Sequence, residues 1–154
     1  MNFKILSRSR IAPKAGDIFV MLPPDNLYLF GCVIDTNANP MGVGGGILIY
    51  IYRPRSPERA PIPALDPADL LIAPLMTNRK PWTQGYFETV TTMPLGPNDR
   101  LAQHSFKTWN DKFVDEFGRP VEEPAAPIGI RGVHSFRTID DEVSKALGFA
   151  FAPD

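Results

Sequence analysis

Short apolar runs separated by turn residues dominate the first half of the chain. Residues 17–22 and 27–35 are rich in β-forming side chains, and the proline pair followed by Asp-Asn between them predicts a hairpin. Gly31 interrupts the second run, which indicates a bulge or a close backbone approach. Residues 47–52, ILIYIY, show no polar alternation and predict a strand that is buried on both faces.

Proline-rich connections and weaker strand patterns come next. Residues 54–67 contain five prolines and predict an extended surface connection. The Asp-Pro pair that ends it is compatible with a short helix, but Pro74 would stop that helix, so a strand near 70–76 is favoured. Further strands are expected at 86–93, at 103–108, within 109–121 around a turn at 116–118, and at 130–138.

One helix is expected, near the C-terminus. Thr138 is suited to be its N-cap, three acidic residues follow in the first turn, and Gly148 suits the position after its end. Apolar residues spaced for one helical stripe lie at Ile139, Val143, Ala146 and Leu147. Seven or eight strands and one helix predict an α+β fold, a mostly antiparallel curled sheet or small barrel with one C-terminal helix.

Composition limits the class of protein. The 154 residues suit a single domain spanning 1–154, and 17 prolines indicate many loops. A net charge of −1 gives no global attraction to nucleic acid or to a membrane surface. The N-terminal residues lack a signal-peptide pattern, no apolar stretch reaches the length of a membrane span, and one cysteine fits a reducing compartment, so a cytoplasmic protein is expected.

Candidate chemistry is sparse, and we expect no catalytic residue, no metal site and no cofactor. The glycines of PMGVGGG match only the start of a dinucleotide motif, and a strand instead of a helix follows them. Cys32 lies in an apolar strand, where a thiol is usually buried and inert. His104 and His134 begin two similar strings, HSFKT and HSFRT, without the paired spacing of metal ligands.

Two charged regions remain as candidate partner-binding sites. The loop TNRKPWTQGY places Arg79, Lys80, Trp82 and Tyr86 together, and arginine and aromatic side chains dominate interface hot spots. A purely structural interpretation of Trp82, as a cover for one end of the sheet, has about equal weight. Residues 110–154 hold nine anions and five cations, and their candidate contact residues are Asp111, Asp115, Glu116, Glu122 and Glu123.

The strings GDIFVMLPPDNLYLFGCVID, LLIAPLMTNRKPWTQGYFETV, DEFGRP and GVHSFRTIDDEVSKALG resemble the immunity protein 26 family of bacterial polymorphic toxin systems. The resemblance covers most of residues 16–148. It implies a small cytoplasmic α+β protein that binds and neutralises a cognate toxin, with no catalysis and no cofactor. The five acidic residues would then face a basic surface, such as the cleft of a nuclease domain, or would simply be solvated.

A second function class stays open at this point. Arg53, Arg55, Arg59, Arg79 and Lys80 could line a phosphate track in a nucleic-acid-binding or ribonuclease-type protein with a small SH3-like barrel. The net charge of −1 and the lack of an evident acid–base pair count against that function. A hydrolase with an unrecognised site is a third class, which a single sequence does not test.

Overall fold

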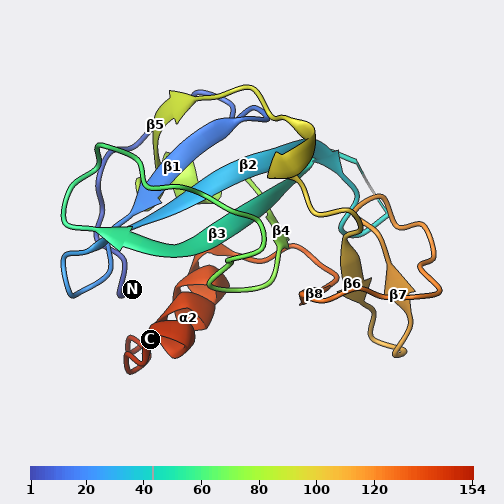
Figure 1. The fold of residues 1–154 in the computed structure, drawn as a ribbon. Coiled ribbons are helices and arrows are strands. Elements are labelled where there is room, and N and C mark those ends of the chain that lie inside the picture. The colour runs from blue at the N-terminus through green and yellow to red at the C-terminus, as the bar shows by residue number, and fades with distance from the viewer. Residues whose placement is uncertain (43) are drawn as a thin grey trace.

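The computed structural model describes residues 1–42 and 44–154, and its centre is a five-stranded antiparallel sheet (Figure 1). The strand order is β4-β3-β2-β1-β5, and the two outer strands do not pair, so the sheet is curled but not closed into a barrel. The strands are β1 (Asp17–Met21), β2 (Tyr28–Ala38), β3 (Gly46–Ser56), β4 (Leu75–Thr77) and β5 (Glu88–Thr92).

The predicted hairpin of β1 and β2 is confirmed, and Gly31 has the close approach expected of it. Gly31 pairs with Phe19, and a Cβ atom at Gly31 would lie 2.3 Å from the Phe19 ring. Only glycine fits there, because the Phe19 ring packs flat across the neighbouring strand. The β2–β3 register also shifts next to Gly31, which adds the bulge that the sequence suggested.

The strand of ILIYIY is longer than expected, and the proline-rich connection begins later. β3 continues through Pro54 to Ser56, whereas the sequence pattern assigned 54–67 to a surface connection. Leu29 pairs with Arg55 and Gly31 with Ile51, so β3 has extra residues between these pairs. Pro54 lies within that bulge, where its missing N–H removes no regular ladder bond.

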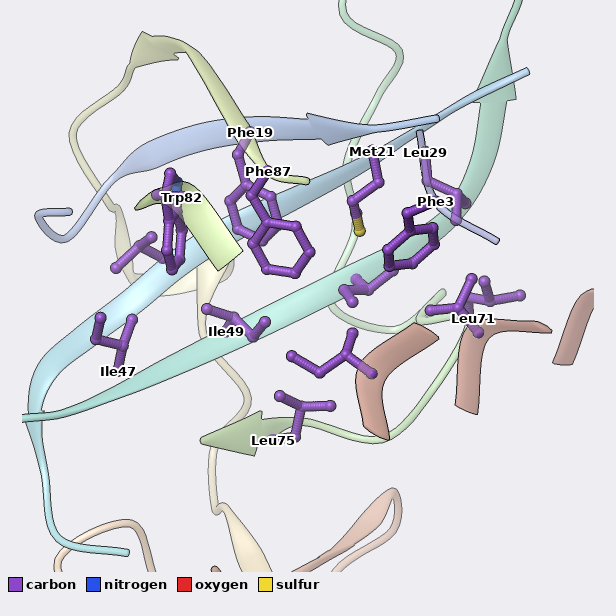
Figure 2. Close-up of a cluster of buried hydrophobic side chains, with 14 residues drawn as sticks. Phe3, Phe19, Met21, Leu29, Ile47, Ile49, Leu71, Leu75, Trp82 and Phe87 are labelled. Atoms are coloured by element: carbon purple, nitrogen blue, oxygen red, sulfur yellow. The ribbon is translucent and has the colours of Figure 1, made fainter. Parts of the chain in front are cut away.

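Both faces of the main sheet are covered, as the ILIYIY pattern predicted. Ile47, Ile49 and Ile51 face one hydrophobic cluster, which Figure 2 shows closing around Phe19, Trp82 and Phe87. The alternate residues Leu48, Tyr50 and Tyr52 face a second cluster on the opposite side. Burying each large apolar side chain contributes about 1.5–3 kcal/mol, so these two clusters hold the fold together.

A small second sheet covers part of the second cluster and lies at the end of the molecule away from the N-terminus (Figure 1). Its order is β7-β6-β8, with β6 (Ser105–Lys107), β7 (Phe113–Val114) and β8 (Ile128–Ile130). β6 pairs antiparallel with β7 and parallel with β8. The chain turns at 116–118 and returns beside β7, as expected, with Pro120 bridging Val114.

The C-terminal helix α2 (Phe136–Leu147) covers the first cluster through Ile139 and Val143. Its N-cap is Ser135, whose hydroxyl accepts from the Thr138 N–H at 3.2 Å, so the assignment of Thr138 as N-cap is wrong by three residues. The strand predicted over 130–138 is also wrong, because β8 ends at Ile130 and the helix begins at Phe136. Gly148 ends the helix in the left-handed conformation, as expected.

Other elements differ in extent. The strand expected over 70–76 is β4 at 75–77, preceded by a single bridge between Leu70 and Tyr52. Two short helices that were not expected are α1 (Lys80–Thr83) and a 3-10 turn at Pro97–Asp99. Within the described residues, no helix is long and apolar enough to cross a membrane.

Candidate functional site

Trp82 lies in the core of the molecule beneath the loop that the sequence singled out. Only 2% of Trp82 is exposed, and its ring meets Phe19 and Phe87 edge-on at centroid distances of 5.2 and 5.1 Å. Its indole N–H donates to the Thr89 hydroxyl at 3.1 Å, which satisfies the one polar atom of the ring. Trp82 therefore has a packing position in the core, and its contacts hold the loop against the sheet.

The cations beside Trp82 are on the surface. Arg79 and Lys80 are both exposed at the start of α1, where Pro81 stands in the first turn and helps to set the helical conformation. Tyr86 is half-buried and stacks on Phe136 of α2 at 5.2 Å. Of the four residues predicted for this site, two are exposed, while Trp82 and Tyr86 support the loop.

An N-terminal arm, residues 1–15, runs along this loop and adds two cations to it. The Leu6 N–H donates to the Gly85 carbonyl at 2.8 Å, and the Ser9 N–H donates to the Trp82 carbonyl at 3.1 Å. These bonds place exposed Arg8 and Arg10 on either side of the Ser9 contact. Sequence reasoning missed both residues, although the basic string SRSR was visible, because no local pattern connects it to a loop over 70 residues away.

A groove of about 440 Å³ lies between the arm, Trp82 and β5. Arg8 and Lys14 line its arm side, while Thr89 and Thr92 line its strand side. The two carboxylates of the groove are already engaged: Asp17 accepts from the Thr92 hydroxyl at 2.7 Å, and Glu88 pairs with Arg59. The groove therefore offers the cations of Arg8 and Lys14 and the Thr89 hydroxyl proton to a ligand.

The five predicted acidic residues differ in burial and in bonding, so they do not form one uniform acidic patch. Asp115 accepts from the Phe117 and Arg119 N–H groups, so it holds the turn after β7. Glu116 is largely buried against His104. Asp111 pairs with Lys107 at 3.1 Å, while Glu122 and Glu123 are exposed and form no ion pair within the described residues.

Trp109 is an exposed aromatic residue that the sequence analysis did not select. It is 96% exposed in the turn between β6 and β7. The turn itself is well bonded, since the Thr108 N–H donates to the Lys112 carbonyl at 2.8 Å and Asp111 adopts a positive φ of 61°. Its neighbours Asn110 and Asp111 are turn-forming residues, and this signal would have placed Trp109 at the tip of a hairpin.

A buried polar chain joins the small sheet to the main sheet. The Glu116 carboxylate accepts from His104 Nδ1, so Nε2 accepts from the Tyr50 hydroxyl, which itself accepts from the Leu101 N–H at 3.0 Å. His104 is 6% exposed, so the whole chain of hydrogen bonds lies below the surface. Burial raises the pKa of Tyr50 to about 12, so its hydroxyl stays protonated as a structural donor.

Cys32 has the inert environment that the sequence predicted. It is buried in β2 and forms part of the wall of a cavity of about 230 Å³. Burial raises the pKa of the Cys32 thiol to about 12, so the reactive thiolate is scarce at neutral pH. In the part of the chain that the structure describes, no group of three His, Cys, Asp or Glu residues could hold a metal ion.

The phosphate track proposed as an alternative is largely neutralised. Arg53 pairs with Asp69, Arg55 makes a two-pronged contact with Asp25, and Arg59 pairs with Glu88. Arg55 holds the pKa of Asp25 below its usual value, mainly by hydrogen bonding, so this pair is charged at neutral pH. Only Arg79 and Lys80 of that track are free of such pairs among the described residues.

These features define a small α+β protein with a curled antiparallel sheet and charged residues on firmly bonded surface segments. The family model named Immunity protein 26 matches residues 14–113, which is about two thirds of the 154 residues. The chain therefore belongs to the immunity protein 26 family, and the resemblance seen in its sequence is confirmed. No curated protein and no solved structure matches the chain.

The matched range divides the candidate residues. It includes Arg79, Lys80, Trp109 and Asp111. It excludes the N-terminal arm before residue 14, the four later acidic residues and the helix α2, although the sequence resemblance was extended to residue 148. The arm and the C-terminal region are thus features of this chain that the family match does not describe.

Proposed function

We propose that this protein binds a cognate toxin domain of a bacterial polymorphic toxin system and neutralises it in the cytoplasm without catalysis. The observation that carries this proposal is the membership of the immunity protein 26 family over residues 14–113. Cys32 and His104 are both buried, and His104 is bonded to Tyr50 and Glu116, which agrees with structural roles for both residues.

The structure has room for such an interface at either end. A stable interface takes about 800 Å² from each partner, which is about a tenth of the 8264 Å² surface of this chain. At one end, Arg79 and Lys80 stand on α1, supported by Trp82 and Tyr86. At the other end, Asp111, Glu122 and Glu123 lie near the β6–β7 turn, while Asp115 and Glu116 shape the turn after β7.

Both surfaces suit recognition because their backbones are already ordered. Residues on bonded turns lose little conformational freedom on binding, so more of the contact energy appears as affinity. Neutralisation then requires only that the bound protein cover the substrate site of the toxin or hold the toxin in an inactive form. No chemical step on this chain is needed.

The test is co-expression with the toxin domain encoded beside this gene. We expect the protein to restore growth to cells that make the toxin, and the two purified proteins to form a stable complex in size-exclusion chromatography. An unrelated toxin from another locus serves as the specificity control. Growth arrest despite full expression of the folded protein, together with no complex, would show that the proposal is wrong.

A further inference from the structure

The cations of this protein are unevenly paired. Of 16 lysines and arginines, six form ion pairs within the described residues: Arg53, Arg55, Arg59, Lys107, Arg119 and Arg137. Half of the other ten gather where the N-terminal arm crosses α1 and β5. We call these five residues the basic arm surface: Arg8, Arg10, Lys14, Arg79 and Lys80.

Nearby carboxylates compensate the basic arm surface only in part. Asp17 is 5% exposed, and its carboxylate accepts from the Lys14 N–H at 3.0 Å and from the Thr92 hydroxyl. Glu88 is engaged by Arg59. Five exposed like charges in one region repel one another, and a ligand of opposite charge relieves that repulsion.

The arm is held firmly enough to present its charges in fixed places. Asp140 of α2 is buried and accepts from the Asn2 and Phe3 N–H groups at 2.9 and 2.7 Å. The contacts of Leu6 and Ser9 with the α1 loop hold the middle of the arm. A binder that needs little ordering retains more of its interaction energy.

We propose that the basic arm surface is the docking site for an acidic segment of the toxin, whose carboxylate side chains contact the exposed cations of the arm and of the α1 loop. This inference rests on the proposed function. Arginine and lysine are the natural partners of carboxylates, and Thr89 adds a hydroxyl whose proton is free because its oxygen accepts from the Trp82 indole. Arg8 and Arg10 lie before the range of the family match, whereas Lys14, Arg79 and Lys80 lie within it.

A protein partner fits this surface better than a nucleic acid does. The whole chain carries a net charge of −1, so the positive field is confined to this region and does not extend along a track. Arg53, Arg55 and Arg59, which would lengthen such a track, are paired with carboxylates. A compact patch of charge matches a short acidic segment.

The test measures the Kd between the purified full-length protein and the toxin domain encoded beside its gene. Two charge-reversal variants probe the surface, R8E/R10E in the arm and R79E/K80E at the start of α1. The matched control is K112E/K145E, which changes the same amount of charge at exposed residues of the β6–β7 turn and of α2. Thermal unfolding of each variant confirms that the fold is retained.

We expect each variant of the basic arm surface to weaken binding at least about 100-fold at 50 mM NaCl, because like charges then oppose each other across the interface. The control should stay within about threefold, as expected for charges outside the interface. Raising NaCl from 50 to 300 mM should weaken wild-type binding about tenfold or more, and should affect R8E/R10E much less.

Three results would overturn the inference while leaving the proposed function intact. The first is wild-type affinity in both variants. The second is loss of binding only in Trp109→Ala or in E122Q/E123Q, which would place the toxin at the other end of the molecule. The third combines two measurements on R8E/R10E: the variant abolishes the salt-sensitive binding of a single-stranded RNA 20-mer, but it binds the toxin as the wild type does. Failure of the wild-type protein to bind the toxin would instead remove the proposed function and this inference with it.

Discussion

The two tryptophans show how little a single residue's neighbours in sequence say about its environment. Trp82 and Trp109 both stand in short polar loops that follow a cation, yet one is 2% exposed and the other 96%. The difference comes from contacts that are distant in sequence, since Phe19 packs against Trp82 from β1. The sequence identified the loop of Trp82 but not the direction in which its side chain points.

Trp82→Ala should destabilise the protein by about 3–5 kcal/mol, because it leaves a cavity between two aromatic rings and removes the partner of Thr89. Urea denaturation followed by circular dichroism measures the free energy of unfolding. Trp109→Ala is the matched control and should change it by less than about 0.5 kcal/mol. Equal stability of the two variants would contradict the packing described for Trp82.

The Cys32 thiol makes stability depend on pH on the alkaline side. Its pKa is raised from 9.0 to about 12 by burial, so above pH 9 the unfolded chain loses this proton while the folded chain keeps it. The stabilising difference is complete below pH 9 and is lost as pH rises toward 12, by up to about 1.4 kcal/mol per pH unit.

Urea denaturation of wild type and Cys32→Ala at pH 8, 9.5 and 10.5 measures this dependence. The variant should show a shallower fall in the free energy of unfolding, with the remainder coming from Tyr50 and Tyr52, whose pKa values burial also raises. Parallel pH profiles for the two proteins would show that Cys32 is not shielded in this way.

At the scale of elements, the strings HSFKT and HSFRT form different structures from nearly the same residues. In the first, Ser105–Lys107 forms β6, while in the second Ser135 caps α2 and Phe136 begins it. Local propensity is nearly identical, so the residues downstream decide the outcome. Trp109 and Asn110 enter a turn after the first string, whereas Ile139 and Val143 supply a buried helical stripe after the second.

The helix boundary can be tested directly. Ser135→Ala should cost about 1 kcal/mol, because the Ser135 hydroxyl accepts the Thr138 N–H at the helix start. Thr138→Ala should cost little, since Thr138 lies inside the helix, where alanine is favoured. Thermal unfolding of the two variants compares them, and a larger loss in Thr138→Ala would restore the boundary expected from the sequence.

Strands with strong apolar runs were predictable, and short elements were not. ILIYIY specified β3 and its two buried faces, because six consecutive apolar residues fit no half-exposed strand. The four residues of α1 are too few for a periodic signal, and the two residues of β7 depend on pairing with β6. The candidate site was predictable only in part. Arg79 and Lys80 are neighbours in sequence and were selected, whereas the N-terminal arm lies beside them only in the folded chain.

At the scale of the whole molecule, the small sheet is joined to the main sheet by a polar chain as well as by apolar contacts. His104→Leu should leave the Tyr50 hydroxyl and the Glu116 carboxylate without their shared partner, at a cost of about 1–3 kcal/mol for each unsatisfied buried group. Hydrogen exchange should then accelerate first in residues 104–130 and later in β1–β3. Uniform acceleration over both sheets would contradict a local role for this chain of hydrogen bonds.

The pairing of the edge strand β5 with β1 contains a β-bulge that affects how the whole molecule associates with other copies. Ile18 pairs with Thr91 and Phe19 with Thr89, so Val90 of β5 faces no partner residue in β1. A bulge makes the free N–H and C=O groups of an edge strand irregular, so a strand of a second molecule pairs with it poorly. The bulge at Val90 therefore protects the threonine-rich edge strand β5 against pairing with other molecules and against fibril formation at high protein concentration. Deleting Val90 would remove this protection.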